Sequence, residues 1–406
     1  MTVPNANTGA DASTGADAST GADASSEVGG QDASGPADNS VPIVVNSGPP
    51  EAEGSQDVPF ISLTICVPGT SQCQDIDYVS VDTGSTGLRI ISSVLSQTLA
   101  LPQAKATTGQ GLAECYTFED GYVWGSVKMA DVKIGGEVAA DIPVQIIGDP
   151  IVAKVPTDCA NSGGLSENTV VDFGAYALIG INQIVPDCGG PCADTKGPAT
   201  AAYYSCSGSD CTAVAVADAD QLSNPIVYFG RDSNGSILQF PTVPAAGAST
   251  LTGSLVFGIG TTSNNALTGG AQVLTIDENG NFTTIYRGQT LDQSYLDTGT
   301  NALSFNDSSI AECPGTDLQG FYCPTSTLSL TAENIGLNDV TSTVTFSVAN
   351  AKTLFENASY SVFDDLGDTG SSGTFAWGFP FFIGRNVYIA IQDAATPGGT
   401  GPYVAY

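Results

Sequence analysis

Two short stretches of sequence decide the fold of this chain: residues 78–90 read YVSVDTGSTGLRI, and residues 294–301 read SYLDTGTN. In both, an apolar or aromatic run leads into Asp-Thr-Gly, so Asp82 and Asp297 each end a predicted strand and open a tight turn that glycine permits. A third copy, at residues 368–370, follows Asp-Asp-Leu-Gly and precedes Ser-Ser-Gly, and we interpret it as a loop. Two copies are therefore distinguished from the third by their strand context.

The two strand-borne copies belong to a duplicated plan. A Leu-Ile-Gly segment begins 96 residues after Asp82, at residues 178–180, and an Ala-Trp-Gly segment begins 79 residues after Asp297, at residues 376–378. Each half of the chain thus reads as a strand, Asp-Thr-Gly, a long β-rich stretch, and two apolar residues before a glycine. A purely structural role for two turn-forming aspartates would leave both triplets and both downstream segments to coincidence.

The remaining pattern predicts a mainly β protein. After residue 58, short β-rich runs alternate with Gly, Asn, Asp and Pro, and runs such as residues 60–65 and 226–229 predict strands. Helical patterns are limited to brief stretches near residues 92–101 and 351–355.

Residues 81–90 and 296–301 resemble the two active-site loops of pepsin-like aspartic proteases, and the chain is similar to a divergent, bacterial-type branch of that family over about residues 58–406. The resemblance implies a mainly β, bilobal fold with an active-site cleft between the lobes. The segments at residues 178–180 and 376–378 are similar to the strands that pass behind each active-site loop in that family.

Three parts are expected along the chain. Residues 1–57 contain nine acidic residues, no Lys or Arg, and no aromatic residue, and a Thr-Gly-Ala-Asp-Ala-Ser hexad repeats near their start. Because such a segment cannot offset its chain entropy by burial, we expect a disordered acidic leader or stalk, which lacks the basic residues of a masking prosegment. The N-terminal β lobe is expected at residues 58–245 and the C-terminal β lobe at residues 246–406.

The resemblance makes Asp82 and Asp297 the expected catalytic pair. Two carboxylates about 3 Å apart in a shielded cleft cannot both ionise, so they hold one proton between them. The ionised member can take a proton from a water molecule while the protonated member donates to the scissile carbonyl. The expected activity is that of an aspartic-type endopeptidase acting on extended peptide or protein substrates at acidic pH.

The resemblance also implies roles for the neighbouring residues. Six residues are expected to support the active-site loops: Thr83, Gly84, Ser85, Thr298, Gly299 and Thr300. The two threonines of the Asp-Thr-Gly triplets would hydrogen-bond across the lobes, and Ser85 and Thr300 would support the outer carboxylate oxygens. The glycines would let backbone amides approach the carboxylates, which favours the ionised form.

A candidate substrate flap lies at residues 115–125, and Tyr116 is the expected flap aromatic. Ordinary cross-strand pairing would explain these aromatic residues equally well. Arg89 stands where the family usually has an aromatic residue, so the pocket under the flap is expected to differ. The segment from Asp187 to Asp220, with four cysteines, also departs from the family pattern and could be a specificity loop or an external brace.

The composition excludes several classes of chemistry. The chain of 406 residues carries 42 Asp and Glu against 10 Lys and Arg, a formal net charge of -32, and contains no histidine. Without an imidazole there is no Ser-His-Asp or Cys-His relay and no His-ligated hydrolytic zinc. So few cations cannot form the basic stripe that nucleic acid requires. We therefore expect no nucleic-acid partner, no metal and no cofactor.

Ten cysteines, several close together in loop-like sequence, indicate disulfides and an oxidising compartment. The Cys206–Cys211 and Cys313–Cys323 pairs are the preferred local bridges, and the other connections stay open. We expect a monomer that is secreted, periplasmic or a cell-surface lipoprotein, with any membrane tether provided by a lipid anchor upstream of this sequence.

Two other functions are compatible with the sequence. A catalytically silent binding or surface-scaffold protein could keep the lobed fold and use its groove to hold a ligand. A glycosidase with two carboxylates is less favoured, because that chemistry does not call for paired Asp-Thr-Gly turns.

Overall fold

The structure is a computed structural model that describes residues 38–52, 54–194, 202–316 and 318–406. The described residues are mainly β, as predicted, and their strands form one sheet of 16 strands, one of seven and one of two. Helices are short, and every α-helix in the described residues has four residues.

The elements have the following bounds. In order across the large sheet, the strands are β11 (Asp210–Ala213), β10 (Tyr203–Ser207), β5 (Gly111–Thr117), β6 (Gly121–Ile134), β7 (Glu137–Ile147), β4 (Thr86–Ile91), β9 (Ala177–Ile181), β3 (Cys73–Asp82), β2 (Pro59–Cys66), β1 (Ser40–Val45), β13 (Leu251–Phe257), β12 (Gly235–Gln239), β22 (Asn386–Ala390), β25 (Tyr403–Ala405) and β14 (Val273–Thr275), with β8 (Leu165–Ser166) beside β6. The seven-stranded sheet contains β19 (Thr341–Val348), β18 (Leu328–Ile335), β15 (Phe282–Tyr286), β16 (Gln289–Leu296), β21 (Phe375–Trp377), β17 (Leu303–Phe305) and β20 (Gly367–Asp368). The two-stranded sheet consists of β23 (Ala395–Thr396) and β24 (Gly399–Thr400). The helices are α1 (Thr157–Ala160), α2 (Val170–Phe173), α3 (Gly190–Ala193) and α4 (Ala351–Leu354), with 3₁₀ turns η1 (Ser92–Val94), η2 (Pro150–Val152), η3 (Asp218–Asp220), η4 (Pro225–Tyr228) and η5 (Phe379–Phe382).

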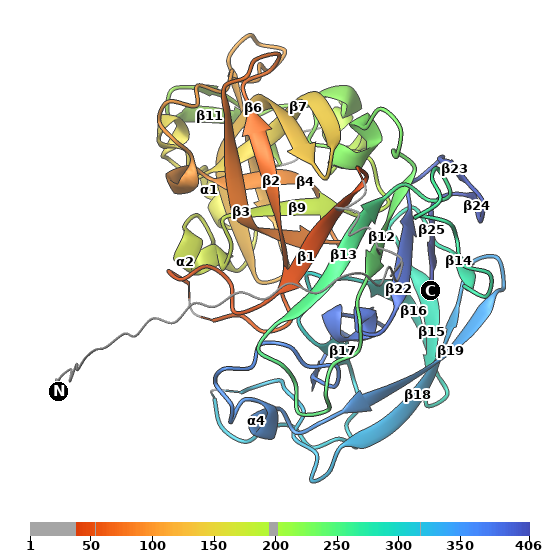
Figure 1. Ribbon diagram of the computed structural model, residues 1–406. Helices are drawn as coiled ribbons and strands as arrows, with labels where there is room; N and C mark the ends of the chain where they lie inside the picture. The colour runs from red at the N-terminus through yellow and green to blue at the C-terminus, as the bar shows by residue number, and fades with distance from the viewer. Residues whose placement is uncertain (1–37, 53, 195–201, 317) are drawn as a thin grey trace, which may run out of the picture. The chain divides into compact units, whose positions relative to one another are not determined.

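Part of the large sheet closes on itself. Strand β6 pairs with β7 and also with β2, so the pairings β6–β7, β7–β4, β4–β9, β9–β3, β3–β2 and β2–β6 complete a ring. Each of the six strands places a fully buried apolar side chain in the same core: Ile65, Val81, Ile90, Val132, Val144 and Ile179. Closing a sheet in this way fills its interior with alternate side chains, as in a small β-barrel. Figure 1 shows these strands together in the upper part of the view.

The seven-stranded sheet covers an aromatic core. The rings of Phe305 and Phe375 stack with centroids 4.7 Å apart, and those of Phe375 and Trp377 stack at 4.0 Å. Phe346 packs edge-on against Phe375 and Trp377 at 5.6 and 5.4 Å. Aromatic pairs of this kind add to the stabilisation from burial alone. Figure 1 shows β15 to β19 in the lower part of the view, coloured green to blue.

The expected leader is wrong at its C-terminal end. Residues 1–37 lie outside the described residues, but β1 lies within residues 1–57 and pairs with β13 along its whole length and with the start of β2. Ile43 and Val45 are fully buried. The acidic composition of residues 1–57, without aromatic residues, predicts no burial, but the run Val-Pro-Ile-Val-Val at residues 41–45 is apolar and pairs with a strand more than 200 residues later.

The expected division at residue 245 is not a division between sheets. Strands β13, β14, β22 and β25 all follow residue 246, yet they belong to the same sheet as β2 to β7. Strand β1 joins the two sets, because it pairs with β2 on one side and β13 on the other.

Two local predictions also need correction. Residues 226–229, expected as a strand, lie mostly in η4, because Pro225 opens the turn and the Asn224 side chain accepts a hydrogen bond from the Ile226 amide. Of the helix expected near residues 92–101, only the three-residue turn η1 forms. The helix expected near residues 351–355 is confirmed as α4.

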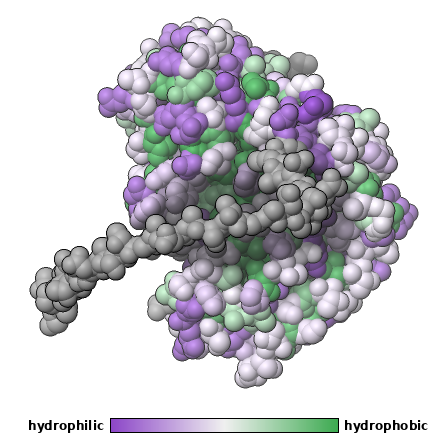
Figure 2. Space-filling model, in the orientation of Figure 1, coloured by the Kyte–Doolittle hydropathy of each residue, from purple (hydrophilic) through white to green (hydrophobic). Residues whose placement is uncertain are grey.

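All ten cysteines form disulfides: Cys66–Cys73, Cys115–Cys159, Cys188–Cys192, Cys206–Cys211 and Cys313–Cys323. Both preferred local bridges are confirmed, and the five pairs fit an extracytoplasmic protein. Across the described residues, no helix has the length and apolar character needed to cross a membrane. Hydrophilic and neutral residues cover most of the face shown in Figure 2, in keeping with the acidic composition.

Candidate active site

The two strand-borne Asp-Thr-Gly loops have the same strand surroundings. Strand β3 ends at Asp82 and pairs in parallel with β9, which also pairs antiparallel with β4 on the far side of the loop. Strand β16 ends one residue before Asp297 and pairs in parallel with β21, which pairs antiparallel with β17. One strand is therefore inserted between the two arms of each loop. This register confirms that the apolar-apolar-Gly segments pass behind the loops.

The glycine that ends each apolar-apolar-Gly segment is required by close packing. A Cβ atom on Gly180 would lie 2.5 Å from the backbone of Ser85, and one on Gly378 would lie 2.1 Å from the carbonyl oxygen of Ala302. Only glycine lets the inserted strand approach its loop so closely. The sequence repeat thus has the same physical cause in both halves.

The two loops bring their carboxyl groups together. A Cβ atom on Gly84 would lie 2.7 Å from Cγ of Asp297, and one on Gly299 would lie 2.9 Å from Oδ1 of Asp82. Each glycine of the two triplets therefore lies against the carboxyl group of the opposite loop. Asp82 is buried, whereas Asp297 is half-buried.

Each carboxyl accepts the same two hydrogen bonds from its own loop. The Gly84 amide donates to Oδ1 of Asp82 at 2.7 Å, and the Ser85 hydroxyl donates to Oδ2. In the second loop, the Gly299 amide donates to Oδ1 of Asp297 at 2.7 Å, and the Thr300 hydroxyl donates to Oδ2 at 2.7 Å. These donors fix the orientation of both carboxyl groups and favour their ionised forms.

The threonines of the two motifs join the loops to each other. The Thr83 amide donates to Oγ1 of Thr298 at 3.1 Å, and the Thr298 amide donates to Oγ1 of Thr83 at 3.0 Å. The Thr298 hydroxyl donates to the Val81 carbonyl at 2.6 Å, and the Thr83 hydroxyl donates to the Leu296 carbonyl at 3.4 Å. Both threonines are buried, so these reciprocal bonds hold the two aspartates in one relative position.

The pair holds a proton more tightly than an ordinary carboxyl does. Burial, followed by the adjacent Asp82 carboxyl, raises the pKa of Asp297 well above its ordinary value, against the lowering effect of Thr300 and Gly299. Removing a proton from such a pair would leave two negative charges side by side in a shielded place. One acid and one base can therefore coexist in this site.

The expected flap residue lies on a β-hairpin near the pair. Strands β5 and β6 form this hairpin, with Tyr116 opposite Val123. Burial raises the pKa of Tyr116 to about 12, with Asp82 among the charges that contribute. The turn of the hairpin carries Glu119, which contributes to the raised pKa of Tyr295 in β16, after burial and Asp297. The hairpin thus interacts electrostatically with residues of both motif regions.

Tyr295 is not among the site residues expected from the sequence. It lies in β16, two residues before Asp297, and the signal in the sequence was this spacing, because alternate residues of an extended chain point to the same side. Arg89 was noted only as a departure from the family pattern. It is fully buried and forms ion pairs with Glu114 and Asp187, both at 2.8 Å.

The third Asp-Thr-Gly copy is not a plain loop. Gly367 and Asp368 form β20, which pairs in parallel with β17, so the loop interpretation needs correction for Asp368, whereas Thr369 and Gly370 lie outside any strand. Burial raises the pKa of Asp368 to about 6, and Glu119 contributes. The carboxyls that meet at the candidate site are nevertheless those of the first two copies.

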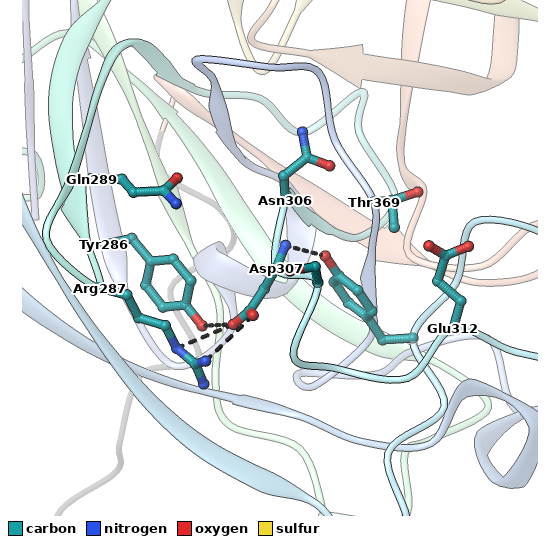
Figure 3. A pocket seen from close by; sticks show the side chains of 9 residues that line it. Tyr286, Arg287, Gln289, Asn306, Asp307, Glu312 and Thr369 are labelled. Carbon is teal, nitrogen blue, oxygen red and sulfur yellow. Dashed lines mark hydrogen bonds and ion pairs between the residues drawn. The ribbon is translucent and has the colours of Figure 1, made fainter.

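A separate polar pocket of about 290 Å³ lies away from the aspartate pair (Figure 3). Its wall includes Thr369 of the third copy and a network centred on Asp307. The Tyr286 hydroxyl donates to Oδ2 of Asp307 at 2.7 Å, and Arg287 Nε lies 3.1 Å from the same oxygen. Because these polar groups satisfy one another, we interpret the network as structural. Within the described residues, no group of three or more His, Cys, Asp or Glu side chains could hold a metal ion.

Comparison with known proteins gives a family without an assigned activity. Residues 35–406 match the family described as "Protein of unknown function (DUF3443)", so the chain belongs to that family. A search of curated proteins found no match. Functional inference therefore depends on the geometry of the site.

Proposed function

We propose that this protein is an aspartic-type endopeptidase that hydrolyses extended peptides at acidic pH, with a water molecule activated between Asp82 and Asp297. The proposal is carried by one observation: two carboxyl groups from loops 215 residues apart meet and receive the same set of hydrogen bonds. A pair of this kind supplies a general acid and a general base together.

The proposed reaction conserves every proton. The ionised carboxylate takes a proton from water as the water oxygen attacks the peptide carbonyl carbon, and the protonated carboxyl donates its proton to the carbonyl oxygen. The resulting diol collapses when one hydroxyl proton returns to a carboxylate and the other carboxyl protonates the amide nitrogen. The C–N bond then breaks to give a carboxylic acid and an amine, and the pair returns to its starting state with no covalent enzyme intermediate.

The proposal includes a bilobal, pepsin-like arrangement. In it, the closed ring of strands that contains β3 supplies Asp82, the seven-stranded sheet supplies Asp297, and the hairpin β5–β6 acts as a flap over a cleft between them. The influence of Asp82 on Tyr116, and of Glu119 on Tyr295, supports this position of the hairpin. The substrate is an extended peptide or protein, and the disulfides support a secreted, periplasmic or surface-anchored enzyme.

A second candidate function is a catalytically silent protein that binds peptides in the same groove. It is favoured by the bracing of the hairpin β5–β6 on both edges, since β5 pairs with β10 and β6 pairs with β8. The Cys115–Cys159 disulfide adds a third attachment. A hairpin held in this way would open less readily than a free one.

The test uses the purified chain and an unstructured protein substrate between pH 3 and 6. We expect cleavage that a statine-type mimic of the tetrahedral intermediate blocks. Asp82→Asn and Asp297→Asn should each lower kcat by about a thousand-fold or more, because each removes the shared proton chemistry. Asp368→Asn, which changes the third copy of the same triplet, is the matched control and should keep most of the activity.

Folding of the variants is checked by circular dichroism and by thermal unfolding. Folded parent protein that binds the statine-type mimic without cleaving any substrate would favour the silent binder. Equal loss of activity in all three variants would contradict the assignment of the pair.

A further inference from the structure

We propose that Arg89 is a positioning residue for the reaction. Its guanidinium holds the hairpin β5–β6 over the aspartate pair through a cation–π contact with the ring of Tyr116. This inference rests on the proposed endopeptidase function. It concerns a cluster of charged residues beside the first motif, and none of those residues is assigned to the chemistry above.

The guanidinium of Arg89 lies where four segments of the chain meet. It comes from β4, the strand that directly follows the first Asp-Thr-Gly loop, and its Nη1 donates to the Thr86 carbonyl at 2.6 Å. Its Nη2 donates to Glu114 of β5 and to Asp187, each at 2.8 Å. Asp187 in turn accepts a hydrogen bond from the Tyr203 hydroxyl of β10 at 2.7 Å.

The aromatic ring of Tyr116 covers this guanidinium. The carbon at the centre of the Arg89 guanidinium lies 3.5 Å from the centroid of the ring, which is the geometry of a cation–π contact. Because Arg89 is fully buried, the contact is shielded from water and stronger than an exposed one. The neighbouring residue Cys115 anchors the same strand to Cys159. The position of Tyr116 is therefore fixed both by the contact of its ring with Arg89 and by the disulfide at the preceding residue.

The charges suit a site that works in acid. The groups around the guanidinium are Glu114 and Tyr116 on β5, Asp187 at the start of the segment with four cysteines, and Tyr203 on β10. Burial and the adjacent Glu114 raise the pKa of Asp187 well above its ordinary value, against the lowering effect of Arg89 and Tyr203, so Asp187 keeps its proton to a higher pH than an ordinary carboxyl. An arginine stays charged over this whole range, so its hold on the ring does not weaken as the pH falls.

The main variant removes the cation without leaving a buried unpaired charge: Arg89→Met with Glu114→Gln and Asp187→Asn. We expect kcat/KM to fall roughly ten- to hundred-fold, because small displacements of a substrate-positioning element have effects of that size. The acidic limb of the pH profile should keep its position, since the Asp82 and Asp297 pair is intact. Arg385→Met is the matched control: Arg385 stacks on Phe381 at 4.6 Å in another part of the structure, and its loss should leave kcat/KM within about two-fold of the parent.

A double-mutant cycle decides whether Arg89 acts through Tyr116. Tyr116→Leu alone should lower kcat/KM to a similar extent, whereas Tyr116→Phe, which keeps the ring, should have little effect. If Arg89 acts through the ring of Tyr116, adding the three substitutions to Tyr116→Leu should lower kcat/KM little further. Additive losses, or a folded triple variant with parental kcat/KM, would overturn the proposal.

Hydrogen exchange separates this proposal from the proposed function. In the triple variant, the amides of residues 111–134 should exchange faster than in the parent and in Arg385→Met, whether or not the protein cleaves peptides. If the parent has no peptidase activity but the triple variant still exchanges faster, the proposed endopeptidase function is refuted and the positioning contact of Arg89 is retained. Unchanged exchange in residues 111–134 would overturn the positioning role in either case.

Discussion

Around Asp82 the chain closes six strands into a ring and adds a buried ion cluster and four disulfides, whereas around Asp297 it packs one sheet over stacked aromatic rings with a single disulfide. The loops themselves carry the same hydrogen bonds in both places. The geometry of each loop is therefore set locally, by the triplet, its glycines and the inserted strand. The surrounding structure only has to hold each loop and its inserted strand in place. Disulfides do so around Asp82, and packed aromatic rings do so around Asp297.

The largest loss of stability is expected when an aromatic side chain is removed from the core around Asp297. Trp377 is fully buried and stacks on Phe375, and it occupies the position in β21 that Ile179 occupies in β9. Trp377→Ala should lower the free energy of unfolding by about 3–5 kcal/mol, because it leaves a large cavity behind the second loop. Urea unfolding followed by tyrosine fluorescence or circular dichroism measures the loss.

Ile179→Val is the control for this change, and it should cost only about 0.5–1.5 kcal/mol because it removes one methylene group. A loss for Trp377→Ala no larger than that of the control would contradict the view that aromatic packing holds the second region together.

The next largest effect is expected from a disulfide of the first region. Replacing both Cys115 and Cys159 with alanine opens a bridge between residues 44 apart in sequence and should cost about 2–4 kcal/mol, since the unfolded chain gains freedom. The matched control replaces Cys206 and Cys211, which are only five residues apart and should cost less. Thermal unfolding of the three proteins gives the ranking. Equal losses would mean that native-state strain, rather than loop length, decides the contribution.

The sequence predicted the parts of this molecule that depend on local rules. Asp82, Asp297 and the glycines at residues 180 and 378 could be found because a tight turn and a close approach of backbone demand particular residue types. The expectation that Thr83 and Thr298 join the loops came from the family resemblance rather than from a local rule. The reciprocal hydrogen bonds are present.

The rest depends on contacts between distant residues, which no local pattern records. Strand β1 pairs with β13, more than 200 residues away, and the short apolar run at residues 41–45 does not by itself identify that partner. The partners of Arg89 lie 25 and 98 residues further along the chain, so the arginine could be recognised as unusual but not as the centre of a cluster. The residues that flank Asp368, Asp-Asp-Leu-Gly and Ser-Ser-Gly, predict a loop, and its pairing with β17 covers only two residues, which leaves no strand pattern in the sequence.

A third test asks whether the two loops are equivalent where they join. Thr83→Val and Thr298→Val each keep the shape of the side chain and remove its hydroxyl, so each leaves an amide and a carbonyl of the opposite loop unpaired. Each variant should lose about 1–3 kcal/mol of stability, the usual cost of buried unsatisfied groups.

The two losses should agree, because the bonds are reciprocal even though the surroundings differ. Chemical denaturation of both variants, with Thr300→Ser as a conservative control, provides the measurement. A loss confined to one of the two variants would break the equivalence of the loops.

The smallest expected effect concerns the contact between the chain before β2 and residues 361–365 of the second region. Asp57 is fully buried, and its Oδ1 accepts a hydrogen bond from the Phe363 amide at 2.8 Å. Burial, and then the charges of Asp365 and Asp364, raise the pKa of Asp57 well above its ordinary value, and burial raises the pKa of Asp365 to about 6. The folded state therefore keeps protons that the unfolded chain has already released.

A carboxyl whose pKa is raised by folding stabilises the protein fully below its ordinary pKa, and this contribution is lost as the pH rises towards the folded value. The melting temperature of the parent should thus fall by a few degrees between about pH 4 and pH 7, and Asp57→Asn should reduce that fall. Asparagine keeps the acceptor for Phe363 and tolerates the left-handed backbone at this position, where φ is 56°. Asp307→Asn is the control of opposite sign, because hydrogen bonds from Ser309 and Tyr286 outweigh burial and lower the pKa of Asp307. Its loss should destabilise the protein at pH 7 more than at pH 3, and a pH dependence that is the same in both variants would show that neither carboxyl controls it.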